Sequence, residues 1–219
     1  MSKFRRQLMM ASMSEPVPPT PVLPYDAEVE YLGYDGLQYI DTGITPNQTI
    51  EAEIKMMPTD ENVNSYAMFG ARNAASNTST KTLFSLAIWS KGTNVALNDY
   101  NYDSGWNNVL AYNTECVLAI KSRKLYKDNT LVVSSGKTNS LSFDVTYGLL
   151  RNHLKNGNWD DRRGTSGRLY YCKIWKGGNL VRDFITVRVG QVGCLYDKVS
   201  EQLFYNVGTG NFTLGNDKN

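Results

Sequence analysis

The chain has 219 residues, of which 11% are aromatic and 20% charged, and tyrosine outnumbers phenylalanine fourteen to seven. Together with eighteen glycines, this composition suits strands and turns better than a helical bundle. Lysine and arginine total 23 against 21 acidic residues, and this near balance argues against a nucleic-acid-binding protein, which would carry a basic surplus.

The N-terminal segment, 1–24, differs from the rest of the chain. Its apolar residues recur at helical spacing beside two arginines, and five of the seven prolines follow between residues 16 and 24. Such a proline run favours an extended spacer of about 3 Å per residue. The apolar stretch is shorter than a signal-peptide core, so we expect the segment to be retained. We predict a docking arm at 1–24 and one domain at 25–219; the alternative is a frayed terminus. The arm residues are Phe4, Arg5, Arg6, Leu8 and Met9.

Short strand-like segments follow one another from Tyr25 onward. Residues 50–56 alternate apolar residues with Glu51, Glu53 and Lys55, which predicts a strand with one face in water. Further strands are expected at 27–32, 37–40, 65–70, 82–89, 116–120, 124–126, 131–134, 142–147, 169–175, 181–189, 194–196 and 203–205. This series without a long helix predicts an all-β fold of two packed antiparallel sheets.

Two polar segments with aromatic residues, 94–113 and 151–167, are expected to be loops. Loops carry function on rigid scaffolds, and sugar sites combine aromatic faces with planar amides and carboxylates. The sequence therefore makes these loops the candidate glycan site; the alternative is that their aromatic residues pack the loops themselves. The candidate residues are Asn98, Asp99, Tyr100, Tyr102, Asp103, Trp106, Trp159 and Asp160.

The sequence contains no pattern that predicts catalysis. Glu51 and Glu53 lie on the wet face of a strand, and the adjacent Asp160 and Asp161 point apart, so neither pair resembles the facing carboxylates of a glycosidase. The only histidine, His153, lies in a predicted loop, where a solvated side chain is usual, and no nucleophile elbow is present. We therefore expect that the protein is not an enzyme.

Cofactor and membrane signals are equally weak. No apolar run reaches the roughly 20 residues that span a bilayer, so no membrane partner is expected. Three widely spaced cysteines among strand-like residues predict small buried side chains, with one disulfide as an alternative. We expect no cofactor; calcium is the alternative, but its candidate ligands lack a spaced motif. These ligands would be Asp99, Asp103, Asp160 and Asp161.

The two ends of the domain resemble one known family. The closing motif comprises Arg182-Asp183-Phe184, Val187-Arg188, Val192-Gly193, Leu195-Tyr196-Asp197 and Gly208-Thr209-Gly210, and the opening motif comprises Glu30-Tyr31-Leu32 and residues 38–44. Both are similar to motifs of the laminin-G-like, concanavalin-A-like jelly-roll family, common in gut bacteriophages, including crAss-like ones, and in surface proteins of gut bacteria. The family usually has proline where Thr186 stands. The resemblance implies a jelly-roll sandwich, here with an extended N-terminal arm.

The resemblance and the arm together predict a non-enzymatic virion surface protein, either a capsid decoration or a head fibre. It would be made in the host cytoplasm, anchored by the arm to capsid or other virion proteins, and would associate with further copies of itself. Its jelly roll would display a site for host-surface or mucus glycans, where many copies multiply weak binding. The alternatives are a lectin-like carbohydrate-binding module of a gut bacterial surface protein and a glycoside hydrolase.

Overall fold

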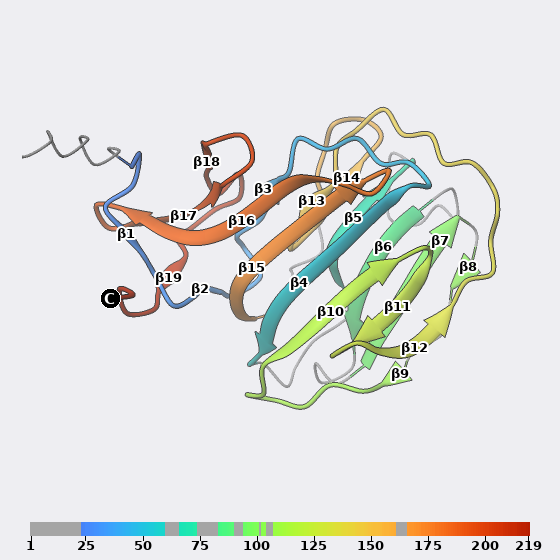
Figure 1. Ribbon diagram of the computed structural model, residues 1–219, viewed down its shortest axis with the longest axis horizontal. Helices are drawn as coiled ribbons and strands as arrows, with labels where there is room; N and C mark the ends of the chain where they lie inside the picture. The colour runs from blue at the N-terminus through green and yellow to red at the C-terminus, as the bar shows by residue number, and fades with distance from the viewer. Residues whose placement is uncertain are drawn as a thin grey trace, which may run out of the picture.

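The computed structural model describes residues 23–59, 66–73, 83–89, 94–100, 102–103, 107–160 and 166–219. Within these ranges the chain forms nineteen strands and no helix. The strands make two sheets that lie one over the other, and the two ends of the described chain lie at the same end of the molecule (Figure 1). The predicted all-β sandwich is confirmed.

The first sheet contains eleven strands. Eight of them follow in the order β12, β11, β10, β4, β15, β16, β17, β18, with antiparallel neighbours throughout. In addition, β2 pairs with β15, β1 with β16 and β19 with β2. The bounds are β1 Ala27–Glu28, β2 Leu32–Tyr34, β4 Ile50–Pro58, β10 Cys116–Lys121, β11 Lys124–Lys127, β12 Thr130–Ser134, β15 Gly167–Lys176, β16 Asn179–Val189, β17 Val192–Asp197, β18 Gln202–Phe204 and β19 Thr213–Leu214.

The second sheet contains eight strands, six of them in the order β3, β13, β5, β6, β7, β8. β9 pairs with β7, and β14 pairs with β5 in the one parallel contact among the described strands. The bounds are β3 Ile40–Asp41, β5 Tyr66–Arg72, β6 Leu83–Trp89, β7 Asn94–Tyr100, β8 Tyr102–Asp103, β9 Asn107–Asn108, β13 Gly148–Leu149 and β14 Asn152–Leu154.

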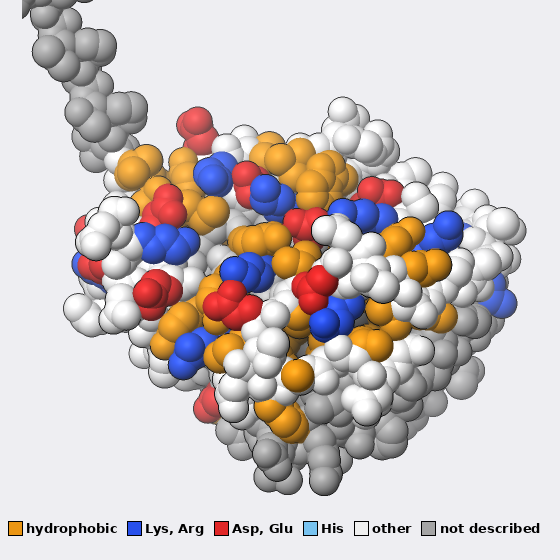
Figure 2. All heavy atoms as spheres, turned by 60° about the horizontal axis from the view of Figure 1, so that its bottom comes forward, with side chains coloured by type: hydrophobic (Ala, Val, Ile, Leu, Met, Phe, Trp, Pro, Cys, Tyr) orange, Lys and Arg blue, Asp and Glu red, His pale blue; other side chains and the backbone are white. Residues whose placement is uncertain are grey.

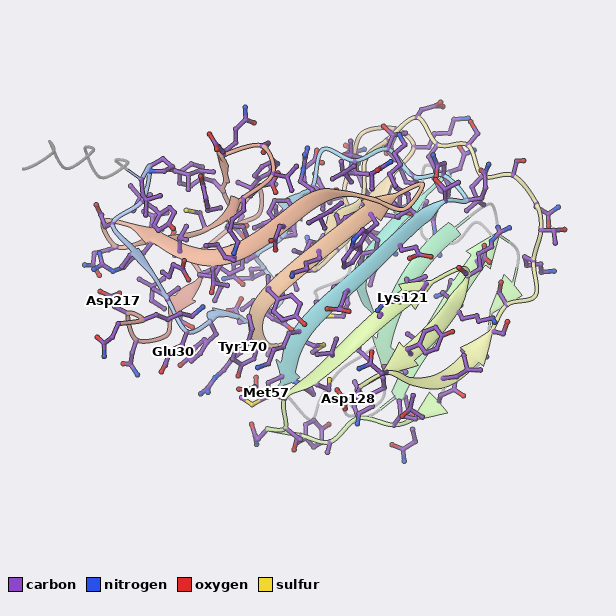
Figure 3. All side chains as sticks on the ribbon, viewed as in Figure 1. Glu30, Met57, Lys121, Asp128, Tyr170 and Asp217 are labelled. Carbon is purple, nitrogen blue, oxygen red and sulfur yellow. The ribbon has the colours of Figure 1, made fainter. Side chains whose placement is uncertain are left out.

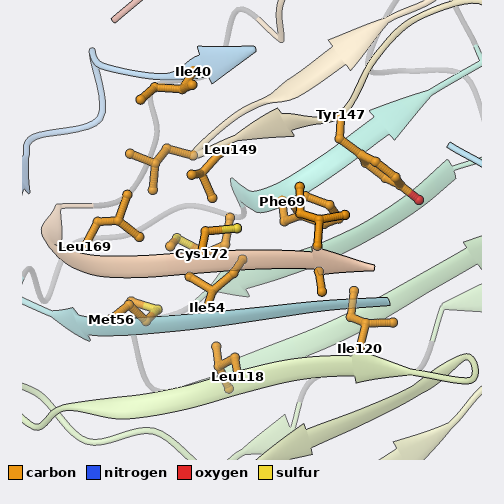
Figure 4. Close-up of a cluster of buried hydrophobic side chains, with 14 of the residues drawn as sticks. Ile40, Ile54, Met56, Phe69, Leu118, Ile120, Tyr147, Leu149, Leu169 and Cys172 are labelled. Carbon is orange, nitrogen blue, oxygen red and sulfur yellow. The ribbon is translucent and has the colours of Figure 1, made fainter. Parts of the chain in front are cut away.

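Apolar side chains from the facing sides of the two sheets form the core (Figure 4). On β4, Ile54 and Met56 are buried while Glu53 and Lys55 are only partly buried, because successive side chains of a strand point to opposite faces. On the other side of the core, the rings of Phe69 and Tyr147 stack with their centres 4.3 Å apart. The predicted wet face of β4 thus belongs to the outer surface of the first sheet.

The closing segment forms the antiparallel strands β16, β17 and β18, as predicted. Thr186 lies in β16, where its Oγ1 donates a hydrogen bond of 2.7 Å to the Val29 carbonyl oxygen. The Val29 N–H in turn donates to the Thr186 carbonyl oxygen at 3.0 Å. Threonine at this position therefore ties the start of the domain to its closing strands.

One predicted loop contains a strand instead. The first seven residues of the segment 94–113 form β7, which pairs with β6 along its whole length. Its Val95, Ala96 and Leu97 are buried. This apolar run is so short, and so closely surrounded by polar residues, that local pattern alone did not distinguish it from a loop. In the second predicted loop, residues 152–154 form β14.

The strand predicted at 142–147 is, conversely, irregular chain. Phe143, Val145 and Tyr147 are buried, so the alternation that suggested a strand is real. The main chain, however, bonds to a loop: the Tyr147 N–H donates to the Ile44 carbonyl oxygen at 2.8 Å. The segment therefore shows the burial pattern of a strand without strand pairing.

The three cysteines are buried and free, in agreement with their interpretation as small apolar side chains. No helix among the described residues is long and apolar enough to cross a membrane.

Candidate functional site

A bulge in β15 changes which of its side chains face water. The register of β15 against β4 shifts between Leu169 and Tyr171, so Tyr170 is an extra residue with no residue opposite. Leu169 and Cys172 are both fully buried, although three residues apart, whereas in a regular strand they would face opposite sides. As a consequence, Tyr170 and Tyr171 both lie partly buried on the outer face, together with Arg168.

Tyr31, just before β2, adds a third ring to this surface. The Arg168 guanidinium lies 4.2 Å from the centre of the Tyr31 ring. The rings of Tyr31 and Tyr170 meet edge to face, with 6.1 Å between their centres. On the other side, the Lys55 ammonium lies 5.0 Å from the centre of the Tyr170 ring. Figure 3 shows Tyr170 where β15 runs beside β2, with Glu30 on the same side of the molecule.

Two hollows of about 470 and about 450 Å³ meet at Tyr31 and Arg168, which line both of them. We call the two together the outer groove. Each volume lies in the range of small-molecule sites, about 300–1,000 Å³. The first hollow takes its polar lining mainly from Asp35, Gln38, Asn113, Asn211 and Thr213. The second is lined by Glu30, Lys55, Glu115, Tyr170, Tyr171 and Lys218.

The floor of the first hollow is held in place by hydrogen bonds. Gln38 is buried; its Nε2 donates to the Asn211 carbonyl oxygen, and its Oε1 accepts from the Asp35 N–H, both at 3.0 Å. At Gly33 a Cβ atom would overlap the Thr213 hydroxyl, so any other residue there would require the Thr213 side chain to move. The polar groups of the first hollow therefore sit on a fixed frame.

The surface around the groove carries charges of both signs between apolar side chains (Figure 2). In the second hollow, Lys55 forms an ion pair of 2.7 Å with Glu115. The Lys218 ammonium lies 3.7 Å from a Glu28 carboxylate oxygen. Glu30 accepts two hydrogen bonds from Asn216, from its main-chain N–H at 3.3 Å and its Nδ2 at 3.1 Å. The charged lining is thus largely ordered by partners within the protein.

Three groups of the groove, Tyr170, Tyr171 and Glu115, have shifted pKa values. Burial, with a contribution from nearby Glu115, raises the pKa of Tyr170 to about 12. Burial and a hydrogen bond of 3.0 Å to Glu53 raise the pKa of Tyr171 to about 12. The hydrogen bond from Lys55 lowers the pKa of Glu115. Both tyrosines therefore keep their hydroxyl proton, and Glu115 is ionised.

These groups suit recognition of a polar molecule that also has an apolar face. The groove offers hydroxyls, amides and carboxylates beside aromatic rings, which is the combination expected for carbohydrate. Within the described part of the chain, no group of three or more histidine, cysteine, aspartate or glutamate side chains is arranged to hold a metal ion.

Asp99, a predicted glycan ligand, lies inside the sandwich. Its side chain is fully buried and forms an ion pair of 2.7 Å with Arg123, and Ser135 Oγ donates to its other oxygen at 2.5 Å. Alternation along β7 places Asp99 on the same face as Val95 and Leu97. A ligand in solvent cannot reach this carboxylate, so the assignment of Asp99 to the glycan site is wrong.

Trp159 and Asp160, the predicted glycan residues of the second loop, are also engaged within the protein. The Trp159 ring stacks on His153, with centres 4.2 Å apart and planes at 8°, and its centre lies 4.6 Å from that of Tyr39. Asp160 is buried. His153, expected to be a solvated loop residue, is instead half buried on β14, and its Nδ1 lies 3.1 Å from Thr146 Oγ1. These contacts match the alternative in which aromatic residues pack their own segment.

The remaining predicted glycan residues belong to the second sheet as far as the structure describes them. Asn98 and the backbones of Tyr100, Tyr102 and Asp103 belong to β7 and β8 of the second sheet, and Trp106 lies outside the described residues. β5 and β6 separate β7 from the strands beside Trp159, so the structure does not join the two predicted loops into one site.

Residues 1–22 of the docking arm, among them Phe4, Arg5, Arg6, Leu8 and Met9, lie outside the described residues. The virion role, its protein partners, self-association and location on the virion stay predictions. The division of the chain into an arm and a domain at residue 24 also stays a prediction.

Sequence reasoning missed the groove residues Tyr31, Arg168 and Tyr170. One local signal was available. Leu169 and Cys172 are both apolar but three residues apart, so a regular strand would place them on opposite faces, and burial of both requires a bulge. The approach of Tyr31 had no local signal, because it depends on the pairing of β2 with β15.

The fold defines a class of protein, the jelly-roll-type β-sandwich. The crystal structure of a putative carbohydrate binding protein from Bacteroides ovatus matches with a TM-score of 0.58 and 12% identity. The match covers 85% of this chain and 60% of that one, so this chain spans about 60% of that protein's length. At such low identity the likeness concerns the fold alone.

The native heptameric SAP-like pentraxin from Limulus polyphemus matches with a TM-score of 0.45 and 14% identity, over 74% of this chain and 80% of that one. No protein-family model and no curated protein matches the chain. The resemblance to the laminin-G-like family therefore stays a prediction beyond the shared jelly-roll architecture.

Proposed function

We propose that the protein is a carbohydrate-binding module that holds a sugar chain, without changing it chemically, in the outer groove of its first sheet. The observation that carries the proposal is the bulge in β15, which places Tyr170 and Arg168 beside Tyr31 between two polar hollows. Sugars present C–H faces to aromatic rings and hydroxyls to amides and carboxylates, and the groove carries both kinds of group.

The length of the groove favours a chain over a single sugar. The two hollows share Tyr31 and Arg168, so a ligand that fills one would continue past these residues into the other. The fold of the Bacteroides ovatus protein, whose printed name refers to carbohydrate binding, agrees with this proposal as a likeness of fold.

The test is titration calorimetry of the full chain with a panel of oligosaccharides of increasing length. We expect affinity to rise from one sugar unit to two, and Tyr31→Ala and Tyr170→Ala each to weaken binding about fivefold, since a lost ring contact is worth about 1 kcal/mol. Tyr126→Ala is the matched control, because this tyrosine lies partly buried on β11 and lines neither hollow. The proposal fails if no oligosaccharide binds, or if Tyr31→Ala behaves like Tyr126→Ala.

The hydrolase alternative is checked in the same samples. A glycosidase would create new reducing ends in the bound oligosaccharide, and we expect their concentration to stay constant over a day of incubation. A steady, protein-dependent increase in reducing ends would instead identify the protein as a glycoside hydrolase.

A further inference from the structure

Arg168 differs from the other cations that line the outer groove. Lys55 and Lys218 each have a carboxylate partner, at 2.7 and 3.7 Å. Among the residues that the structure describes, no carboxylate comes within the 4.0 Å ion-pair distance of Arg168. Its guanidinium is half buried and rests on the Tyr31 ring, 4.2 Å from the ring centre. Among the described residues, Arg168 is therefore the cation of the groove that has no ion-pair partner.

The carboxylates of the groove do not take that place, because each has donors of its own. Glu115 is bound to Lys55, and Glu30 accepts two hydrogen bonds from Asn216. Asp35 accepts from the Leu37 N–H at 3.2 Å. A ligand group at Arg168 therefore need not displace an existing ion pair.

The chemistry of a stacked guanidinium limits what this group can be. The Arg168 guanidinium lies over the Tyr31 ring and also interacts with the Tyr170 hydroxyl, and the other N–H groups along its edge can donate to a ligand. A planar carboxylate matches that edge with two parallel hydrogen bonds, which a hydroxyl cannot do. Because Arg168 lines both hollows, an anion bound there would lie in the middle of the sugar chain.

We propose that the outer groove selects acidic sugars and that Arg168 binds the carboxylate of a uronic-acid unit; this inference rests on the proposed function. A sulfate ester would offer similar anionic oxygens to the same arginine, so the two sources of negative charge must be separated by experiment. The planar geometry favours the carboxylate.

The experiment compares an acidic sugar with its uncharged ester and with a sugar that carries sulfate in place of carboxylate. Full-length protein is titrated with oligogalacturonate, with the same oligomers as methyl esters, and with a sulfated galactan oligomer. We expect oligogalacturonate to bind at least tenfold more tightly than its methyl ester and more tightly than the sulfated oligomer, since hydrogen bonds to charged groups are the strong ones.

Three variants connect the preference to the residue. Arg168→Gln should weaken oligogalacturonate binding about 10- to 100-fold and leave the methyl ester within about twofold. Arg168→Lys should fall between the two, because an ammonium keeps the charge but not the paired donors. Lys124→Gln, on β11 and outside both hollows, removes the same charge and should bind all sugars like the unchanged protein.

Distinct outcomes separate this inference from the proposed function. Equal affinity for the acid and its ester, or equal behaviour of Arg168→Gln and Lys124→Gln, would overturn the acidic-sugar assignment while carbohydrate binding stands. If the sulfated oligomer binds more tightly than oligogalacturonate, and Arg168→Lys keeps this preference, the ligand of Arg168 is a sulfate ester and the assignment of a carboxylate is overturned. If none of the three sugars binds, and the oligosaccharide panel is also negative, both proposals fail.

Discussion

Removing either partner of the buried ion pair between Asp99 and Arg123 should be one of the most destabilising single substitutions in the sandwich. Asp99 lies on β7 of the second sheet, and Arg123 lies in the turn between β10 and β11 of the first. Arg123 also donates to the carbonyl oxygens of Lys137 and Asn139, at 3.0 and 2.8 Å. The pair therefore connects the two sheets and a loop through one guanidinium.

Asp99→Ala removes a carboxylate that is fully buried and leaves the Arg123 cation without a charge partner, with side-chain exposures of 0% and 10%. Removing one partner of a buried pair costs about 3–5 kcal/mol of unfolding free energy, because the remaining charge stays in a poorly solvated interior. For a domain of this size that loss should lower Tm by roughly 10 °C.

Urea denaturation followed by tryptophan fluorescence measures the unfolding free energies of Asp99→Ala, Arg123→Ala and the double variant. The double variant should be destabilised by clearly less than the sum of the single ones, since it leaves no unpaired charge. Lys121→Ala is the control: its pair with Glu53 is 3.1 Å long but partly exposed, and its loss should cost at most about 1 kcal/mol. A cost of Asp99→Ala near that of Lys121→Ala, or strict additivity, would refute the reasoning.

Three further predictions follow from burial and close packing. Burial raises the pKa of the Cys116 thiol to about 12 and that of Cys194 to about 11. At pH 8 a disulfide reagent should therefore titrate no thiol in the folded protein and three thiols after unfolding. Rapid reaction of a thiol in the folded protein would contradict this. Gly148→Ala should lower the free energy of unfolding by about 1–3 kcal/mol, because the added Cβ would overlap the Arg151 carbonyl oxygen and meet the Trp159 ring at 2.5 Å. Gly157→Asn is the control, since a Cβ at Gly157 meets no atom within 4 Å. Equal Tm values of the two variants in thermal unfolding would count against the close packing. The raised pKa of Tyr171 contributes stability below pH 10, and this contribution is lost as pH rises from 10 through about 12. The Tm of Tyr171→Phe should therefore fall less over that interval than the Tm of the unchanged protein. Parallel curves of Tm against pH would disprove this prediction.

Several features of the fold could be derived from the sequence because they depend on neighbouring residues. The alternation in 50–56 determined both that β4 is a strand and which of its faces is wet. The apolar runs of the closing segment, separated by glycine and polar turns, determined the strands β16, β17 and β18. A strand pattern of this kind repeats every two residues, so it can be recognised without knowing what the strand pairs with.

The local sequence pattern did not predict secondary structure correctly where strand formation depends on the partner strand. The segment at 94–100 became a strand because β6 lies beside it along its full length, and that pairing turned Asp99 from a predicted surface ligand into a buried partner of Arg123. At 142–147 the same kind of alternation marks a segment without strand pairing. Tertiary context outweighs local preference in β structure.

The candidate site itself was decided only by the tertiary structure. The sequence determined that the protein is a β-sandwich with a nearly balanced charge, and it indicated that aromatic and polar residues could form a sugar site. Which residues do so depends on the register of β15 against β4, which turns Tyr170 outward, and on the pairing of β2 with β15, which brings Tyr31 under Arg168. Register and long-range pairing are properties of the assembled sheet, because each strand supplies only half of the hydrogen bonds that define them.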